Sequence, residues 1–182
     1  MRFEELPLAG AFRIELDRLG DARGFFARTF CEDEFKTHGL ATTWAQCNMS
    51  FSAQQGTVRG LHFQRPPFAE AKLVRCVRGA VMDVVVDLRV GSSTYGDCCC
   101  EEISDHDRSM MYVPAGCAHG FQTLTPSVEM IYFHSAPYDR AHEGGVNWSD
   151  PSVAVPWPLE VTEVSERDSA LPMLDILEPI DL

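Results

Sequence analysis

The regular spacing of short apolar segments between turn-forming residues constrains the fold of this chain more than any other feature. From residue 46 to residue 138, Gly, Pro, Asn, Asp or Ser interrupts the apolar segments at intervals of about ten residues. This spacing is typical of β-sandwiches and β-barrels, so we predict an all-β jelly roll. The turn signals are Gln55-Gly56, Pro66-Pro67, Arg78-Gly79, Gly91-Ser92-Ser93, Ser104-Asp105 and Pro114-Ala115-Gly116.

Within the segments, apolar and polar residues alternate with the period of two that a half-buried strand requires. The first segment puts three apolar residues on one face: Phe12, Ile14 and Leu16. A second strand is expected over residues 25 to 30, after a turn at Gly20-Asp21. Residues 32 to 38 are predicted to form a short helix that ends at Gly39.

Two acidic residues occur within the most apolar segment, residues 80 to 89. Asp83 and Asp87 fall on the face that also carries Val81 and Val85. Because this face is expected to point inward, the pattern predicts a barrel lumen that is polar in places.

Length and charge indicate one globular domain that does not bind nucleic acid. The 182 residues, 45% hydrophobic and 23% charged, contain no linker or repeat, so residues 1 to 182 are read as a single domain with a C-terminal extension from residue 139. The net charge of −12 opposes nucleic-acid binding, which needs a positive field. Any phosphate must therefore be held by a local site, for which arginine is well suited.

Cysteine usage and hydropathy predict a cytoplasmic protein without a membrane partner. The seven cysteines are an odd number and form no CxxC pair, which fits reduced thiols. The first residues contain no apolar signal region, and no segment approaches the roughly 18 apolar residues that cross a membrane.

The densest group of reactive side chains lies between residues 59 and 72. Alternation places Gly60, His62 and Gln64 on one face of a strand, and we expect Lys72 on an adjoining strand. A base and a cation then line one cavity. The alternative is that His62 is a hydrogen-bonded core histidine and Lys72 a surface cation.

Four further polar residues have both a functional and a structural interpretation. His119 precedes Gly120, which permits close approach of a ligand or of another backbone in a β-bulge. Tyr132 and Tyr138 either share a face of one strand or pack at a sheet edge. Asp168 completes the Ser165-x-x-Asp capping pattern, or it orients His62 from across the fold.

A metal site is not expected. His62-Phe63-Gln64 lacks the His-x-His pair with which many jelly rolls bind a metal, and the positive charge of Lys72 opposes cation binding. Walker A, GxSxG, HExxH and dinucleotide-binding motifs are absent.

Nine ordered motifs span most of the chain: Gly20–Phe26, Gln46–Ser50, Arg59–Gln64, Lys72–Cys76, Asp83–Arg89, Pro114–Phe121, Asp150-Pro151, Trp157-Pro158 and Ser165–Asp168. Through these motifs the chain resembles the dTDP-4-dehydrorhamnose 3,5-epimerase family over essentially its full length. The resemblance implies a cupin jelly roll with N-terminal strands and short peripheral helices, a homodimer, and no metal or organic cofactor.

The resemblance implies epimerisation next to the C4 ketone of a nucleotide-linked 4-keto-6-deoxyhexose. It makes His62 the proton acceptor, paired with Asp168, and Tyr132 the proton donor on the opposite face of the sugar. Lys72 then stabilises the enolate, which a weak carbon acid requires. The remaining substrate contacts that it implies are Arg23, Phe26, Arg28, Gln46, Asn48, Arg59, Lys72, His119, Tyr138, Glu143 and Arg167, with Tyr138 stacking on the base.

Two departures from the family leave details open. Family members that use thymidine commonly carry a glutamate where this chain has Arg28, so dTDP-, CDP-, GDP- and UDP-linked sugars are all considered. The lysine that often follows the tyrosine is missing after Tyr132, which leaves open whether C3, C5 or both are epimerised. The pathway and final sugar also remain open.

Three other functions compete with epimerisation. A 3,4-ketoisomerase uses the same base, but Tyr132 and the C-terminal extension favour an epimerase. A metal-dependent cupin oxygenase is opposed by the missing His-x-His pair. A non-catalytic sugar-nucleotide-binding protein has no need to retain His62, Lys72, Tyr132 and Asp168 together.

Overall fold

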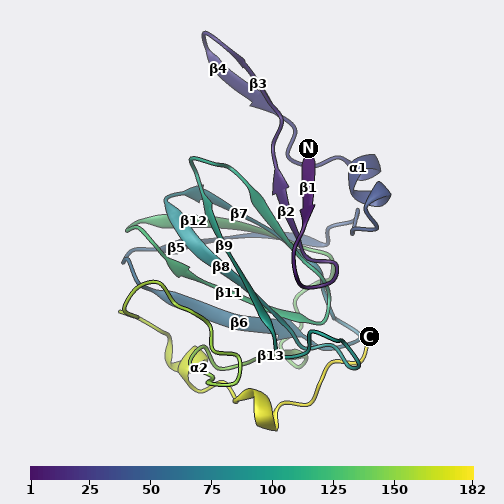
Figure 1. Ribbon diagram of the computed structural model, residues 1–182, viewed down its shortest axis with the longest axis vertical. Helices are drawn as coiled ribbons and strands as arrows, with labels where there is room; N and C mark the ends of the chain where they lie inside the picture. Colours follow the sequence, from purple (N-terminus) through teal and green to yellow (C-terminus); the bar gives the residue numbers. More distant parts are fainter.

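The computed structural model describes residues 1–182 and consists of two facing β-sheets with a projecting hairpin (Figure 1). The six-stranded sheet has the order β1 (Arg2–Glu5), β2 (Phe12–Glu15), β10 (Met110–Val113), β7 (Lys72–Arg78), β12 (Val128–His134), β5 (Gln46–Ser52). The five-stranded sheet has the order β13 (Glu143–Gly145), β6 (Val58–Gln64), β11 (Cys117–Thr123), β8 (Ala80–Asp87), β9 (Cys98–Ser104). The hairpin consists of β3 (Arg18–Asp21) and β4 (Gly24–Ala27), and all strand pairs in the three sheets are antiparallel.

The main core lies between the two sheets. Alternation in β8 sends Val81 and Val85 into this core, while Val84 and Val86 pack on the outer face of the five-stranded sheet. That outer face is covered by the C-terminal extension through Val153 and other apolar residues. Each apolar side chain buried completely contributes roughly 1.5–3 kcal/mol, so both faces of this sheet stabilise the fold.

Three short helices lie outside the sheets. Helix α1 (Glu32–Thr37) packs the fully buried Phe35 against part of the outer face of the six-stranded sheet. Helix α2 (Glu166–Ser169) and the 3-10 helix η1 (Leu174–Ile176) belong to the C-terminal extension, which runs below the five-stranded sheet in Figure 1. None of these helices is long and apolar enough to cross a membrane.

The structure confirms the predicted jelly roll and the helix that precedes Gly39, and it corrects two boundaries. The turn lies at Ala22-Arg23 rather than at Gly20-Asp21, because the Asp21 carboxylate accepts the Arg23 backbone N–H at 2.8 Å and closes the turn there. The strand predicted over residues 25 to 30 ends at Ala27, because Ala27 pairs with Arg18 at the last rung of the hairpin.

The β3–β4 hairpin projects away from the two sheets (Figure 1). Leu19 and Phe26 are 73% and 72% exposed, and Phe25 is also exposed. Exposed apolar side chains on a projecting hairpin are characteristic of a surface that another molecule covers.

Candidate active site

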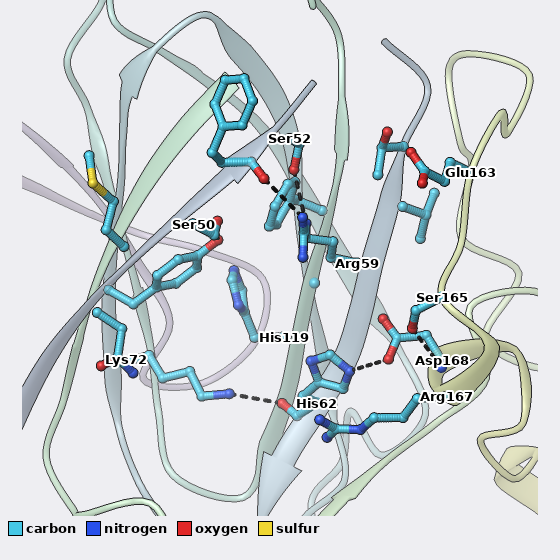
Figure 2. Close-up of a pocket in the computed structure, with 18 of the residues that line it drawn as sticks. Ser50, Ser52, Arg59, His62, Lys72, His119, Glu163, Ser165, Arg167 and Asp168 are labelled. Atoms are coloured by element: carbon cyan, nitrogen blue, oxygen red, sulfur yellow. Dashed lines mark hydrogen bonds and ion pairs between the residues drawn. The ribbon is translucent and has the colours of Figure 1, made fainter. Parts of the chain in front are cut away.

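One cavity of about 630 Å³ opens between the two sheets (Figure 2). Strands β5, β7 and β12 of the six-stranded sheet and β6 and β11 of the five-stranded sheet supply its walls, and the C-terminal extension closes one side. A cavity of this size accommodates a small organic ligand. Its polar side chains are Asn48, Ser50, Ser52, Thr57, Arg59, His62, Lys72, His119, Tyr132, His134, Glu163, Ser165, Arg167 and Asp168.

His62 and Asp168 form a hydrogen-bonded pair although 106 residues separate them. The His62 Nε2 atom lies 2.8 Å from Asp168 Oδ1. The imidazole is 32% exposed, whereas the carboxylate is almost fully buried. Because Asp168 occupies Nε2, the other ring nitrogen is available to accept a proton from a molecule in the cavity.

The two interpretations of Asp168 are resolved by its position in helix α2. The Ser165 hydroxyl caps this helix by accepting the Asp168 backbone N–H at 3.0 Å. The Asp168 carboxylate is thereby free to accept from His62 and from the Gly60 backbone N–H at 3.0 Å. Burial alone favours the neutral acid, but the hydrogen bonds from His62 and Gly60 outweigh it, so the pKa of Asp168 lies below its ordinary value.

The Gly60 N–H is available to Asp168 because strands β6 and β11 are irregular at this point. Their register shifts between His119 and Phe121, directly opposite Gly60. A Cβ atom on Gly60 would lie 2.6 Å from the Gly120 Cα atom. Gly120, the glycine after His119, therefore allows another backbone segment to approach closely. This is one of the two alternatives given above, the other being close approach of a ligand.

Tyr132 lies on the sheet opposite His62. It belongs to β12 in the six-stranded sheet, whereas His62 belongs to β6 in the five-stranded sheet. The phenol oxygen is 2.8 Å from the Ser50 hydroxyl. Burial raises the pKa of Tyr132 above its ordinary value, so the phenol keeps its proton at neutral pH.

Lys72 also lines the cavity, but from a different place than the sequence predicts. It begins β7, which pairs with β10 and β12 and not with β6, so it reaches the cavity from the opposite sheet rather than from an adjoining strand. The loop that follows β6 crosses between the sheets, which the strand pattern does not reveal. The Lys72 ammonium donates to the His62 carbonyl at 3.0 Å. Burial lowers its pKa, while the charges of Glu70 and Asp83 oppose that shift.

Two more predicted residues line the cavity with fixed orientations. His119 is the direct cross-strand neighbour of His62, and its Nε2 atom lies 2.8 Å from Asp83 Oδ1. Asp83 thus supplies the polar character that the alternation of residues 80 to 89 predicts. Arg59 donates to the Ser52 hydroxyl and to the Phe51 carbonyl, both at 2.9 Å.

The other predicted substrate contacts fall into three groups: residues that line the cavity, residues just outside it, and residues in or next to the hairpin. Asn48 and Arg167 line the cavity, and Arg167 is joined through the Glu143 carboxylate to the Tyr138 hydroxyl just outside it. Gln46 also lies outside and accepts the Tyr138 backbone N–H at 2.8 Å. Three predicted contacts lie in or next to the hairpin and do not line this cavity: Arg23, Phe26 and Arg28.

Several polar cavity residues were missed from the sequence. Ser50 and Ser52 share the inward face of β5 with Asn48, so the period of two could have found them. His134 likewise follows Tyr132 by two residues. Glu163 comes from the C-terminal extension, where no periodicity signals an inward face. No group of three or more His, Cys, Asp or Glu side chains is arranged to hold a metal ion.

Comparison with known proteins gives one family. The model of the family described as dTDP-4-dehydrorhamnose 3,5-epimerase matches residues 5–175. The dTDP-4-dehydrorhamnose 3,5-epimerase of Sinorhizobium fredii (strain NBRC 101917 / NGR234) is 46% identical over 175 residues, which cover 96% of this chain and 90% of that protein. The dTDP-4-dehydrorhamnose 3-epimerase of Streptomyces niveus is 42% identical over 171 residues, which cover 92% of this chain and 81% of that protein.

A solved structure shows the same fold. NovW, a 4-keto-6-deoxy sugar epimerase from the novobiocin biosynthetic gene cluster of Streptomyces spheroides, matches with a TM-score of 0.91 at 39% sequence identity. The match covers 96% of this chain and 88% of NovW. Sequence and three-dimensional structure therefore agree on one group of proteins.

Proposed function

The chain belongs to the dTDP-4-dehydrorhamnose 3,5-epimerase family, and from that premise we propose how its cavity performs the reaction. It is an isomerase that inverts C3, C5 or both in a nucleotide-linked 4-keto-6-deoxyhexose, a reaction of deoxysugar biosynthesis. One observation carries the proposed mechanism: the His62–Asp168 pair and Tyr132 belong to opposite walls of one cavity.

His62 removes the proton from the carbon next to the ketone. The C–H electron pair becomes a carbon–carbon double bond, and the C4 oxygen takes the negative charge of an enolate. Asp168 holds the imidazole in one orientation and stabilises the imidazolium that forms. The proton acceptor is the ring nitrogen that Asp168 does not occupy.

Lys72 stabilises the enolate, and Tyr132 completes the inversion. The positive charge of Lys72 acts strongly because the ammonium is buried. The Tyr132 phenol then donates its proton to the carbon from the face opposite His62. Proton exchange with water returns the phenol to its neutral form and His62 to the free base, so the enzyme is unchanged overall.

Arginine side chains support a diphosphate site at the open end of the cavity. Arg59 and Arg167 both line it, and their planar groups suit phosphate oxygens. Asn48 and His119 offer further hydrogen bonds to the sugar or the phosphates. Gln46, Tyr138 and Glu143 lie just outside, where Tyr138 is exposed and free to stack on a base.

We propose dTDP as the nucleotide, because the relatives from Sinorhizobium fredii and Streptomyces niveus are named as epimerases of a dTDP-linked sugar. Arg28 does not oppose this choice, since it is bound to Glu34 at 3.0 Å and its charge is compensated within the chain. The relatives include both a 3,5-epimerase and a 3-epimerase, so the experiment below follows C3 and C5 separately.

We propose that the protein works as a homodimer in the cytoplasm. Met49 and Phe51 are exposed on β5 at the edge of the six-stranded sheet, and the hairpin carries further exposed apolar residues. A second copy covering these surfaces brings Arg23, Phe26 and Arg28 to the cavity of its partner, which accounts for their distance from the cavity of their own chain. All seven cysteines are free thiols, as a reducing compartment requires.

The mechanism is tested by incubating the enzyme in D₂O with 4-keto-6-deoxyhexoses linked to dTDP, CDP, GDP or UDP. We expect NMR to show deuterium entering at C3, C5 or both of the dTDP-linked sugar. His62→Asn should abolish exchange at every position because the base is lost. Tyr132→Phe should keep some exchange but yield little inverted product.

Alternative outcomes separate the competing functions. No deuterium in any of the four substrates would overturn the proposed mechanism. A keto group that moves from C4 to C3 would identify a 3,4-ketoisomerase, and activity that depends on a bound metal would identify an oxygenase. Exchange at the wild-type rate in His62→Asn would assign the base to another residue.

A further inference from the structure

A buried glutamate that the mechanism above does not use lies beside Lys72. Glu70, on the loop before β7, is only 7% exposed and does not line the cavity. Its Oε1 atom lies 3.4 Å from the Lys72 ammonium. Its Oε2 atom accepts a hydrogen bond from the Gln64 amide at 2.9 Å. His134 Nδ1 lies 3.2 Å from the same oxygen, close enough for an ion pair but not aligned as a hydrogen bond.

A charged carboxylate in this position is stable only because its partners surround it. Burying an ion away from water costs several kcal/mol unless charges or hydrogen bonds compensate it. Burial opposes ionisation of Glu70, but His134 and Lys72 outweigh that effect, so the pKa of Glu70 lies below its ordinary value. Glu70 is therefore a fixed negative charge at neutral pH.

Of the two carboxylates near Lys72, only Glu70 lies within ion-pair distance of its ammonium. An ammonium has three N–H donors, and the Lys72 ammonium has contacts with the His62 carbonyl at 3.0 Å and with Glu70. The second nearby carboxylate, Asp83, is shared with His119. The titratable groups around this ammonium are Glu70 on the preceding loop, Asp83 on β8, His62 on β6, His119 on β11, and Tyr132 and His134 on β12.

We propose that Glu70 is a positioning residue for the epimerisation, which keeps Lys72 charged and directs its remaining N–H into the cavity. Glu70 acts through Lys72 and does not touch the substrate. This inference rests on the role given to Lys72 under the proposed function. The Gln64 amide in turn holds Glu70 in place through its hydrogen bond. The sequence places Gln64 on the same face of its strand as His62, yet Gln64 does not line the cavity, and this contact with Glu70 gives it a role.

The presence of only two lysines, Lys36 and Lys72, makes a direct test available. With lysine labelled by ¹³C at Cε, the full chain should give two NMR signals, and Lys36→Arg identifies the one from Lys72. We expect Lys72 to remain charged at pH 7.5 in the wild type. In Glu70→Gln, which keeps the shape but removes the charge, its titration should move down by about one pH unit or more.

Activity in the same variant tests the catalytic consequence. As Lys72 loses its proton at a lower pH, the alkaline limb of the kcat profile should move to lower pH by the same amount, while KM changes less than about twofold. Glu129→Gln is the matched control, because Glu129 on β12 pairs with Arg78, which lies at the other end of β7 from Lys72, and the change should affect neither measurement.

Three results would overturn the proposal. The first is a Lys72 titration that is the same in Glu70→Gln and in the wild type. The second is a shifted titration with an unshifted kcat profile. The third, which requires no variant to fold, is a wild-type Lys72 that is neutral at pH 7.5. Because the titration is measured without substrate, its result is independent of whether the enzyme epimerises any sugar tested.

Discussion

At the residue scale, His62 and His119 are direct neighbours across the β6–β11 ladder, and both are bound to an aspartate. Their exposure distinguishes them, since the His62 side chain is 32% exposed and that of His119 is 5% exposed. A general base must reach the proton that it removes, so His62 is suited to proton transfer and His119 to a fixed hydrogen bond. His119 thus belongs to the same cavity wall as His62 but is not suited to act as the base.

The first residue-scale prediction concerns the orientation of His62. In Asp168→Asn the amide no longer compensates the imidazolium, so kcat should fall by about 100-fold or more while the fold is retained. The measurement is deuterium incorporation in D₂O by NMR. Asp139→Asn is the matched control, because Asp139 pairs with His142 at 2.8 Å outside the cavity and should leave kcat unchanged. An Asp168→Asn enzyme within twofold of wild type would exclude the pair from catalysis.

The sequence predicts individual cavity residues better than the contacts that connect them. Alternation places His62 on the inward face, but the family resemblance is needed to choose between a base and a core histidine. Glu70 gives no signal, because it lies in a loop without periodicity and its three partners come from separate segments. Such contacts depend on how strands pair across the fold, which local patterns do not encode.

At the element scale, the irregular pairing of β6 and β11 connects the fold to the cavity. Gly60 has a φ of +120°, and its N–H donates to Asp168 instead of continuing the ladder. Both Gly60 and Gly120 lack the space for a Cβ atom, since each faces the backbone of the other strand at less than 3 Å. The bulge therefore fixes both strands and the position of the Asp168 carboxylate.

The prediction at this scale is that Gly60→Ala destabilises the fold. The added methyl group meets the Gly120 backbone at 2.6 Å, and alanine strongly disfavours this φ, so the free energy of unfolding should fall by about 2 kcal/mol or more. Urea denaturation followed by circular dichroism measures it. Gly39→Ala is the control for the φ effect alone, because Gly39 also has a positive φ but nothing lies within 4 Å of its Cβ position; its cost should be about 1 kcal/mol. Equal losses in both variants would argue against the steric contact.

The sequence predicts where several strands lie along the chain, but it does not predict which strands pair with one another. The apolar periodicity locates β2 and β8, and Gly39 locates the end of α1. The sequence does not reveal that β6 and β7 belong to different sheets, because consecutive strands usually pair and here the connecting loop passes from one sheet to the other. The end of β4 at Ala27 was also missed, since it depends on the length of its partner strand.

At the scale of the whole molecule, the hairpin and the cavity of one chain are separate. Arg23, at the hairpin turn, is bound to Asp21 and is otherwise exposed. If a partner subunit supplies this residue, each catalytic unit contains groups from two chains. Closed two-fold symmetry then gives two equivalent cavities in each dimer.

This arrangement predicts complementation between two inactive enzymes. His62→Asn lacks the base and Arg23→Ala lacks the hairpin contact, so each alone should show strongly reduced activity. After mixing and subunit exchange, heterodimers contain one cavity with both residues intact, and activity should approach about a quarter of the wild-type value. Gel filtration confirms the dimer, and D₂O exchange measures the activity. A mixture no more active than its components would mean that Arg23 does not act in the partner's cavity.

The position of Asp168 in the C-terminal extension also has a consequence for the newly made chain. His62 leaves the ribosome 106 residues before the carboxylate that orients it. At about 5–20 residues per second, the interval between them is roughly 5–20 s. The last strand, β13, ends at Gly145, so both sheets are complete before Asp168 is made, while the base still has no partner and the outer face of the five-stranded sheet still lacks part of its cover. A chain that stops before Asp168 therefore contains the base without the carboxylate that orients it, and we expect such a chain to be inactive toward sugar nucleotides.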